Sequence, residues 1–143
     1  MRIEVMSRNK FETYMAQNHK MTSIVVSISA IGENAPVVLK TANNGIIGAL
    51  ILQFNDVANP DSGYGGITEE QAIGIAEFIS SGIGIADKII VHCGAGQSRS
   101  AGVAAAILKY YTGSDLAIYN NPMYTPNNLC YRRVLKALID IKA

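Results

Sequence analysis

The sequence has no tryptophan, only two cysteines and few charged residues, and these shortages exclude several classes of protein. Cys93 and Cys130 are too few for the disulfide framework of a small secreted domain. Charged residues make up 16% of the chain and the formal net charge is +1, so no strong field attracts nucleic acid or an anionic membrane. Apolar residues make up 49%, which argues against disorder and favours a well-packed core.

Long apolar runs and internal repeats are also missing. No stretch approaches the roughly 20 apolar residues that span a bilayer, and residues 1–8 lack the apolar segment of a secretion signal. No repeat of about 20 to 50 residues indicates a solenoid or propeller. We therefore expect a single domain over residues 1–143, located in the cytoplasm, where reducing conditions suit a free thiol.

What the sequence does contain is an apolar run that enters a glycine-rich turn. The β-branched run that starts at Ile89 predicts a buried parallel strand, and the segment that starts at Ser98 predicts a helix. The first N–H groups of a helix have no partner within the helix. Together with the helix dipole, they form a seat for an anion such as phosphate.

Two side chains make this seat reactive. Cys93 ends the predicted strand and Arg99 follows with five residues between them, so the turn can bring both side chains to one anion. The neighbouring positive potential favours the thiolate of Cys93. The planar fork of Arg99 can grip two phosphate oxygens at once, and the Ser100 hydroxyl can hydrogen-bond the sulfur. The turn is therefore predicted to hold a nucleophile that attacks phosphorus.

Residues 92–100, His-Cys-Gly-Ala-Gly-Gln-Ser-Arg-Ser, resemble the His-Cys-x5-Arg-Ser/Thr loop of the protein tyrosine phosphatase and dual-specificity phosphatase superfamily, whose small bacterial or phage-like members are the nearest in pattern. The likeness extends over about residues 46–142. It implies an α/β fold with a central, mostly parallel, twisted sheet flanked by helices, a phosphocysteine intermediate and no metal or other cofactor. It also implies that His92 supports the loop without touching phosphate. The phosphate-binding residues would be Gly94, Ala95, Gly96, Gln97, Ser98 and Arg99.

Two other glycine-rich turns are alternatives. Gly94-Ala95-Gly96 begins the G-x-G-x-x-G pattern of dinucleotide-binding turns, but Arg99 stands where the last glycine would be, and a reactive cysteine has no role there. In a rhodanese-type sulfur-transfer loop, the cysteine and the arginine lie one residue closer together. The spacing in this chain therefore disfavours both alternatives.

The loop after the predicted strand that ends at Phe54 carries two candidate general acids. Residues 53–66 are rich in Gly, Pro, Asn and Asp, and they follow the carboxyl end of a strand, where α/β proteins usually bind ligands. A carboxylic acid there can protonate the leaving oxygen. Asp61 lies 32 residues before Cys93 (93 − 61 = 32), similar to several small dual-specificity phosphatases. The Phe-Asn-Asp setting of Asp56 resembles bacterial-type and phosphatase-of-regenerating-liver-like members. We favour Asp56 and keep Asp61 as the alternative.

The remaining segments predict a scaffold. Alternation and apolar runs predict an edge strand at residues 2–6, a central strand at residues 23–29 and a buried strand at residues 46–54. Thr68 and Asn127 are predicted to cap the second and the last of the helices. The predicted helices span residues 8–17, 69–80, 97–111 and 127–141.

The predicted function is that of a cysteine-based phosphatase acting on phosphorylated protein or peptide, mainly phosphotyrosine, with dual specificity as an option. Gly94, Ala95 and Gln97 carry no charge. Superfamily members that act on inositol phospholipids commonly have lysines there, so a polyphosphorylated lipid is disfavoured. A non-catalytic phosphotyrosine-binding module, a phosphoinositide phosphatase and an RNA 5′-phosphate phosphatase remain alternatives. We expect no metal, nucleic-acid or membrane partner, and the oligomeric state stays open.

Overall fold

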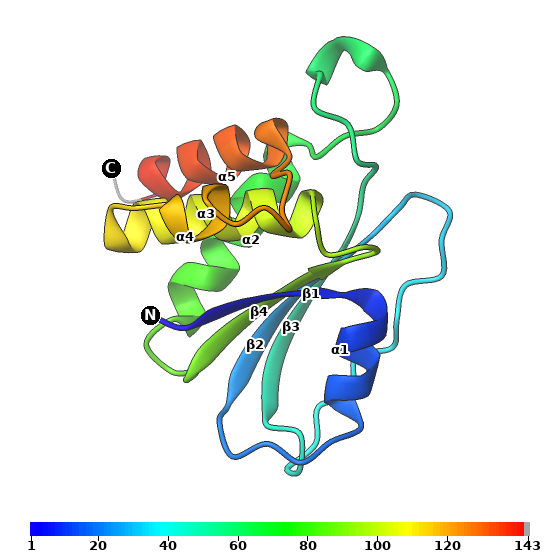
Figure 1. The fold of residues 1–143 in the computed structure, drawn as a ribbon, viewed down its shortest axis with the longest axis vertical. Helices are drawn as coiled ribbons and strands as arrows, with labels where there is room; N and C mark the ends of the chain where they lie inside the picture. The colour runs from blue at the N-terminus through cyan, green and yellow to red at the C-terminus, as the bar shows by residue number, and fades with distance from the viewer. Residues whose placement is uncertain (142–143) are drawn as a thin grey trace.

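Four parallel strands form the sheet around which the chain folds (Figure 1). The computed structural model describes residues 1–141, and its strands are β1 (Ile3–Ser7), β2 (Ser23–Ser29), β3 (Ile46–Gln53) and β4 (Lys88–Cys93). Their order is β1-β4-β2-β3, and each neighbouring pair is parallel. All four carboxyl ends therefore lie at one edge of the sheet, which is where open α/β sheets bind their ligands.

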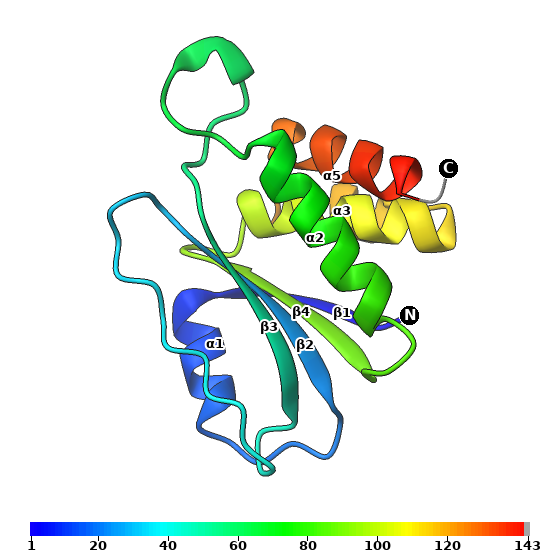
Figure 2. The same ribbon diagram turned by 180° about the vertical axis from the view of Figure 1, so that it is seen from behind.

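Helices cover both faces of this sheet (Figures 1 and 2). The helix α1 packs on one face and α2 and α3 pack on the other, while α5 packs on α2 and α3 and the short α4 packs beside α3. Their bounds are α1 Arg8–Met15, α2 Glu69–Gly82, α3 Arg99–Thr112, α4 Leu116–Tyr119 and α5 Asn128–Asp140. The predicted α/β architecture is confirmed. The helix α4 and a 3-10 turn at Pro60–Ser62 are additions that the sequence did not predict.

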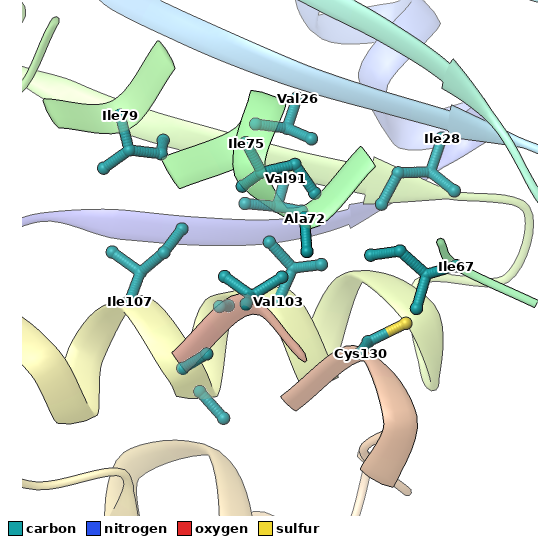
Figure 3. Packing of buried hydrophobic residues seen from close by; sticks show 14 of the residues in the cluster. Val26, Ile28, Ile67, Ala72, Ile75, Ile79, Val91, Val103, Ile107 and Cys130 are labelled. Carbon is teal, nitrogen blue, oxygen red and sulfur yellow. The ribbon is translucent and has the colours of Figure 1, made fainter. Parts of the chain in front are cut away.

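Successive side chains of the strands enter two different cores, because they point to opposite faces of the sheet. Val26 and Val91 belong to the larger core, between the sheet and α2, α3 and α5. Val25 and Ile90 belong to the smaller core, where Phe11 of α1 is fully buried. Figure 3 shows the larger core with Val26, Ile28, Val91, Ile75, Val103 and Ile107 around its centre.

The prediction of a buried strand at residues 46–54 is wrong in one respect, because β3 lies at an edge of the sheet. Ile47 is 45% exposed and Ile51 is 49% exposed. The apolar composition of the run indicates a strand but does not reveal its place in the strand order. By contrast, β2 is buried along its whole length between β4 and β3, as predicted. Within residues 1–141, no helix is both long enough and apolar enough to cross a membrane.

The predicted helix starts at Thr68 and Asn127 are confirmed. The Oγ1 of Thr68 accepts a hydrogen bond from the backbone N–H of Gln71 at 3.1 Å, and the Gln71 side chain accepts from the Thr68 N–H at 2.9 Å. The Oδ1 of Asn127 accepts from the backbone N–H of Cys130 at 2.9 Å. These caps fix where α2 and α5 begin, and the start of α5 lies beside the turn that follows β4.

Candidate active site

The turn after β4, residues 94–98, forms a cradle of backbone that we call the phosphate loop. Gly96 has a φ of +70°, and a Cβ at this position would lie 2.6 Å from the backbone nitrogen of Ser7. Only glycine allows the loop to approach the junction of β1 and α1 so closely. The N–H of Arg8 donates to the carbonyl of Gly94 at 3.0 Å, which fastens the start of the loop to the same junction.

The later carbonyl groups of the phosphate loop are held from outside the cradle. The carbonyl of Gln97 accepts from the N–H of Thr125 at 2.9 Å. The carbonyl of Ser98 accepts from the N–H of Asn127, also at 2.9 Å. Within residues 1–141, no acceptor is hydrogen-bonded to the N–H groups of residues 94–98. Carbonyl groups that are bonded outward leave the N–H groups available for an anion.

Cys93 lies at the floor of this cradle. It ends β4 and is only 2% exposed, and its Sγ is 3.0 Å from the Oγ of Ser100. Ser100 is fully buried in the first turn of α3. A hydroxyl group at this distance can donate to a thiolate, both when the sulfur attacks and when it leaves. The structure therefore brings together the sulfur and the hydroxyl that the sequence paired.

The guanidinium group of Arg99 turns back over the start of the phosphate loop. Its Nη2 lies 3.5 Å from the position that a Cβ on Gly94 would occupy, and its Nη1 donates to the carbonyl of Phe54 at 3.0 Å. Its Nε is buried and has no hydrogen-bond partner among the described residues. A buried N–H without a partner is costly, so an anion oxygen bound in the cradle would relieve that cost.

Asp56 docks on the rim of the phosphate loop. Its Oδ1 accepts hydrogen bonds from the Oγ of Ser98 at 2.7 Å and from the Nδ2 of Asn127 at 2.8 Å. The Asp56 residue itself remains exposed, whereas Asn127 is only 4% exposed. A carboxyl group is thus fixed next to the cradle while part of it still faces solvent.

Asp61 lies in a different environment. It belongs to the 3-10 turn Pro60–Ser62, on the segment that projects beyond α5 in Figure 1. It is exposed, and its carboxylate has no hydrogen-bond or ion-pair partner within residues 1–141. Of the two candidate acids, the structure brings Asp56 to the phosphate loop and leaves Asp61 outside it.

His92 supports the end of β4 from the face of the sheet that carries α1. Its ring is fully buried and stacks on the ring of Phe11, with 4.4 Å between centroids. Its Nε2 is hydrogen-bonded to the Oγ of Ser27 at 2.7 Å. Burial is the largest cause that lowers the pKa of His92, to about 4, so the ring is neutral at pH 7. These contacts hold the strand that carries Cys93.

The long-range contacts of the site were not predicted from the sequence. They include the bond from Asn127 to Asp56, the bond between Ser27 and His92, and the bond from Arg99 to the carbonyl of Phe54. Asn127 was predicted only as a helix cap. Asn127 and Asp56 are 71 positions apart, and no local pattern links residues at that distance.

The groups that surround the cradle suit an anion. They are backbone N–H donors and a guanidinium group, and such groups bind phosphate oxygens. Within the described part of the chain, no group of three or more His, Cys, Asp or Glu side chains is placed to hold a metal ion.

The fold is similar to that of several solved structures, although neither a protein-family model nor a curated protein matches the sequence. PTPMT1 in complex with PI(5)P aligns with a TM-score of 0.61 and 13% identity, over 99% of this chain and 92% of that chain. The human tyrosine phosphatase-like serine/threonine/tyrosine-interacting protein aligns with a TM-score of 0.58 and 22% identity, over 96% and 87% of the two chains. The Yvh1 phosphatase domain from Chaetomium thermophilum aligns with a TM-score of 0.56 and 19% identity, over 98% and 90%.

One of these structures is a phosphatase domain and another is named tyrosine phosphatase-like, and human DUSP28 aligns as well, with a TM-score of 0.57 and 15% identity over 98% of this chain and 93% of that chain. The similarity extends over nearly the whole chain on both sides of each comparison. The chain therefore has the dual-specificity phosphatase fold, as its phosphate-loop sequence led us to expect. What it does with that fold depends on the chemistry of its own site.

Proposed function

We propose that this chain is a cysteine-dependent phosphatase that hydrolyses phosphomonoesters on proteins, with phosphotyrosine as the preferred substrate. One observation carries the proposal: the Cys93 sulfur, the buried and unpartnered Nε of Arg99 and the docked carboxyl of Asp56 belong to one phosphate loop and its rim. A nucleophile, an oxyanion clamp and an acid are the three groups that phosphoryl transfer to a thiolate requires.

In the first step, the Cys93 thiolate attacks phosphorus in line with the leaving oxygen. The S–P bond forms as the P–O bond to the substrate's phenoxide or alkoxide breaks. Arg99 and the loop N–H groups bind the three non-bridging oxygens, which carry the charge in the transition state. Protonated Asp56 gives its proton to the leaving oxygen.

In the second step, water hydrolyses the phosphocysteine. The Asp56 carboxylate accepts a proton from the attacking water, a P–O bond forms and the S–P bond breaks. Cys93 leaves as a thiolate, to which the Ser100 hydroxyl donates at the 3.0 Å distance described above. Inorganic phosphate is released, and both Asp56 and Cys93 return to their starting protonation states.

Phosphorylated protein or peptide is the substrate class that we propose. The exposed loop residues Gly94, Ala95 and Gln97 carry no charge, so the loop offers no cation to further phosphates of an inositol lipid. A structural neighbour, PTPMT1, was solved with PI(5)P, and a phosphoinositide therefore belongs in the substrate panel. A catalytic thiolate needs a reducing compartment, which is the basis of the cytoplasmic location that we also propose.

A non-catalytic phosphotyrosine-binding module is the second candidate, because one structural neighbour is named a tyrosine phosphatase-like interacting protein. Such a module binds phosphate but needs neither a nucleophile nor an acid. The Ser100 hydroxyl beside Cys93 and the docked Asp56 would then have no chemical task. These two groups favour the enzyme over the module.

Initial rates on phenyl phosphate, phosphotyrosine and phosphothreonine peptides, a phosphoinositide and an RNA 5′-phosphate test the proposal, each with and without chelator. We expect the phosphotyrosine peptide to be the best substrate. Cys93→Ser should lower its turnover on the order of 10⁴-fold or more and retain tungstate binding. The matched control is Cys130→Ala, which removes the other cysteine and should keep the wild-type rate.

Two outcomes of these assays would contradict the proposal. Binding of the phosphotyrosine peptide without any turnover would establish the non-catalytic module instead. Turnover that survives in Cys93→Ser would exclude Cys93 as the nucleophile.

A further inference from the structure

The residue that caps α5 makes contacts that capping does not require. The Oδ1 of Asn127 serves the cap, through the N–H of Cys130 at 2.9 Å. Its Nδ2 instead reaches across to the loop after β3, where it donates to the Oδ1 of Asp56 at 2.8 Å and to the carbonyl of Val57 at 3.2 Å. Its backbone N–H donates to the carbonyl of Ser98. One nearly fully buried residue thus joins three parts of the chain: its side chain links α5 to the loop that bears the acid, and its backbone N–H binds the phosphate loop.

The two donors on Asp56 determine which of its oxygens can carry a proton. Oδ1 accepts from both the Ser98 hydroxyl and the Asn127 amide. A protonated carboxyl group has one O–H, and the oxygen that already accepts two hydrogen bonds is poorly placed to bear it. The transferable proton is therefore expected on Oδ2.

We propose that Asn127 is a positioning residue, which holds Asp56 so that its Oδ2 faces the leaving group. This inference rests on the proposed phosphatase function and deepens it. Asn127 does not touch the substrate and acts only through Asp56. A small misplacement of a catalytic group can lower the rate by up to about 10²-fold.

The thiol of Cys130, on α5, lies within the electrostatic reach of Asp56, and the charges of Arg99 and Cys93 act on the same thiol. Burial, the largest cause, and the charge of Asp56 raise the pKa of the Cys130 thiol well above its ordinary value, so this thiol stays neutral. Because the side-chain amide of Asn127 contacts Asp56 directly, replacing Asn127 with aspartate places a second carboxylate against Asp56.

Asn127→Asp is the informative variant because it separates the two roles of this residue. The new carboxylate keeps an oxygen for the cap of α5 but replaces the donor to Asp56 with an acceptor. Two adjacent carboxylates share a proton and hold it to higher pH. The limb of the pH profile of kcat/KM that depends on protonated Asp56 should move upward by about one pH unit or more. The substrate for this measurement is phenyl phosphate, whose phenoxide is a poor leaving group.

Asn128→Asp is the matched control. Asn128 is exposed, is the first residue of α5, and its side chain has no hydrogen-bond partner among the described residues. The substitution adds the same charge one position away, and the limb should stay at its wild-type pH. The Asp56→Asn variant identifies this limb of the pH profile independently, because the limb should be absent from that variant.

A second variant covers the case in which Asn127→Asp folds poorly. Asn127→Ser keeps an acceptor for the cap and removes the donor to Asp56. We expect kcat on phenyl phosphate to fall about tenfold, because the acid is misplaced, while kcat on p-nitrophenyl phosphate, which needs little protonation to leave, stays within about twofold. An equal loss on both substrates would indicate a purely structural role and overturn the inference.

The remaining outcomes distinguish a failure of this inference from a failure of the proposed function. A normal wild-type profile together with an unshifted limb in folded Asn127→Asp would overturn this inference alone. Absence of turnover in the wild-type chain would overturn both the inference and the proposed function.

Discussion

The phosphate loop and the loop that bears the acid, residues 54–66, meet at the same edge of the sheet but are held in different ways. Backbone hydrogen bonds fasten the phosphate loop on two sides, to the start of α1 and to the segment before α5. The acid loop is closed at its base, where the N–H of Asn55 donates to the carbonyl of Gly65 at 2.7 Å. Beyond Asp56 it projects outward through the Pro60–Ser62 turn (Figure 1). We conclude that the site combines a rigid anion-binding loop with a second loop that contributes only its base, where Asp56 lies.

The two aspartates of the acid loop give the sharpest test of this difference. Asp56→Asn removes the proton that the leaving oxygen needs, and we expect kcat on phenyl phosphate to fall about 10²- to 10⁴-fold. Asp61→Asn changes a carboxylate outside the site, and we expect kcat to stay within about twofold of wild type. Similar losses in both variants would show that the outer part of the loop closes over the substrate, contrary to this comparison.

Substitution of one glycine in each loop tests the difference in rigidity, because both glycines have a positive φ. Gly96 and Gly63 have φ values of +70° and +76°, but only Gly96 has backbone atoms within 3.0 Å of an added Cβ. Gly96→Ala should lower the free energy of unfolding by about 3 kcal/mol, from backbone strain plus a clash with β1. Gly63→Ala should cost about 1 kcal/mol, from strain alone. Urea unfolding of both variants measures the difference.

Equal costs for Gly96→Ala and Gly63→Ala would contradict the close approach of the phosphate loop to Ser7. A further check is the phosphatase activity of Gly96→Ala under conditions in which this variant is fully folded. Gly96→Ala should lose turnover even where it remains folded, because the N–H groups of the cradle move.

An effect smaller than that of Gly96→Ala concerns the support of β4 by His92. Its pKa is lowered from 6.5 to about 4 in the folded chain, so the unfolded chain binds the extra proton between these values. Stability is therefore fully present above about pH 6.5 and is lost as the pH falls toward 4. Between pH 7 and pH 4.5, the His92 contribution should fall by about 2 kcal/mol.

Urea unfolding of wild type and His92→Asn at both pH values measures this contribution. The variant should be less stable at pH 7, since it loses the stacking on Phe11, and its stability should depend less on pH. An unchanged pH dependence would mean that other groups account for the acid sensitivity of the fold.

The same comparison explains how much of the molecule could be predicted from its sequence. The phosphate loop could be predicted because its determinants are contiguous: Cys93, Gly96, Arg99 and Ser100 lie within one strand–turn–helix unit. For the acid, the sequence favoured Asp56 over Asp61 only through a family resemblance, because the contact that holds Asp56 comes from Asn127, which is far away in the chain. Both Asp56 and Asp61 sit in a polar loop where composition alone favours neither.

Three structural features also escaped prediction for physical reasons. The helix α4 and the Pro60–Ser62 turn are too short to show a hydrophobic period. The exposure of β3 follows from its place at the edge of the sheet, which is a property of strand order rather than of any local pattern. Helix caps, in contrast, are local, and those at Thr68 and Asn127 were predicted correctly.

The most direct test of the central claim is to trap the phosphoryl group on the protein during turnover. The chain is mixed with a radiolabelled aryl phosphate, quenched in acid at short times and digested, and the labelled peptide is sequenced. We predict that the label lies on the peptide that contains Cys93 and is absent from Cys93→Ser. Label on any other residue, or hydrolysis with no labelled protein at any quench time, would contradict the role that we assign to Cys93.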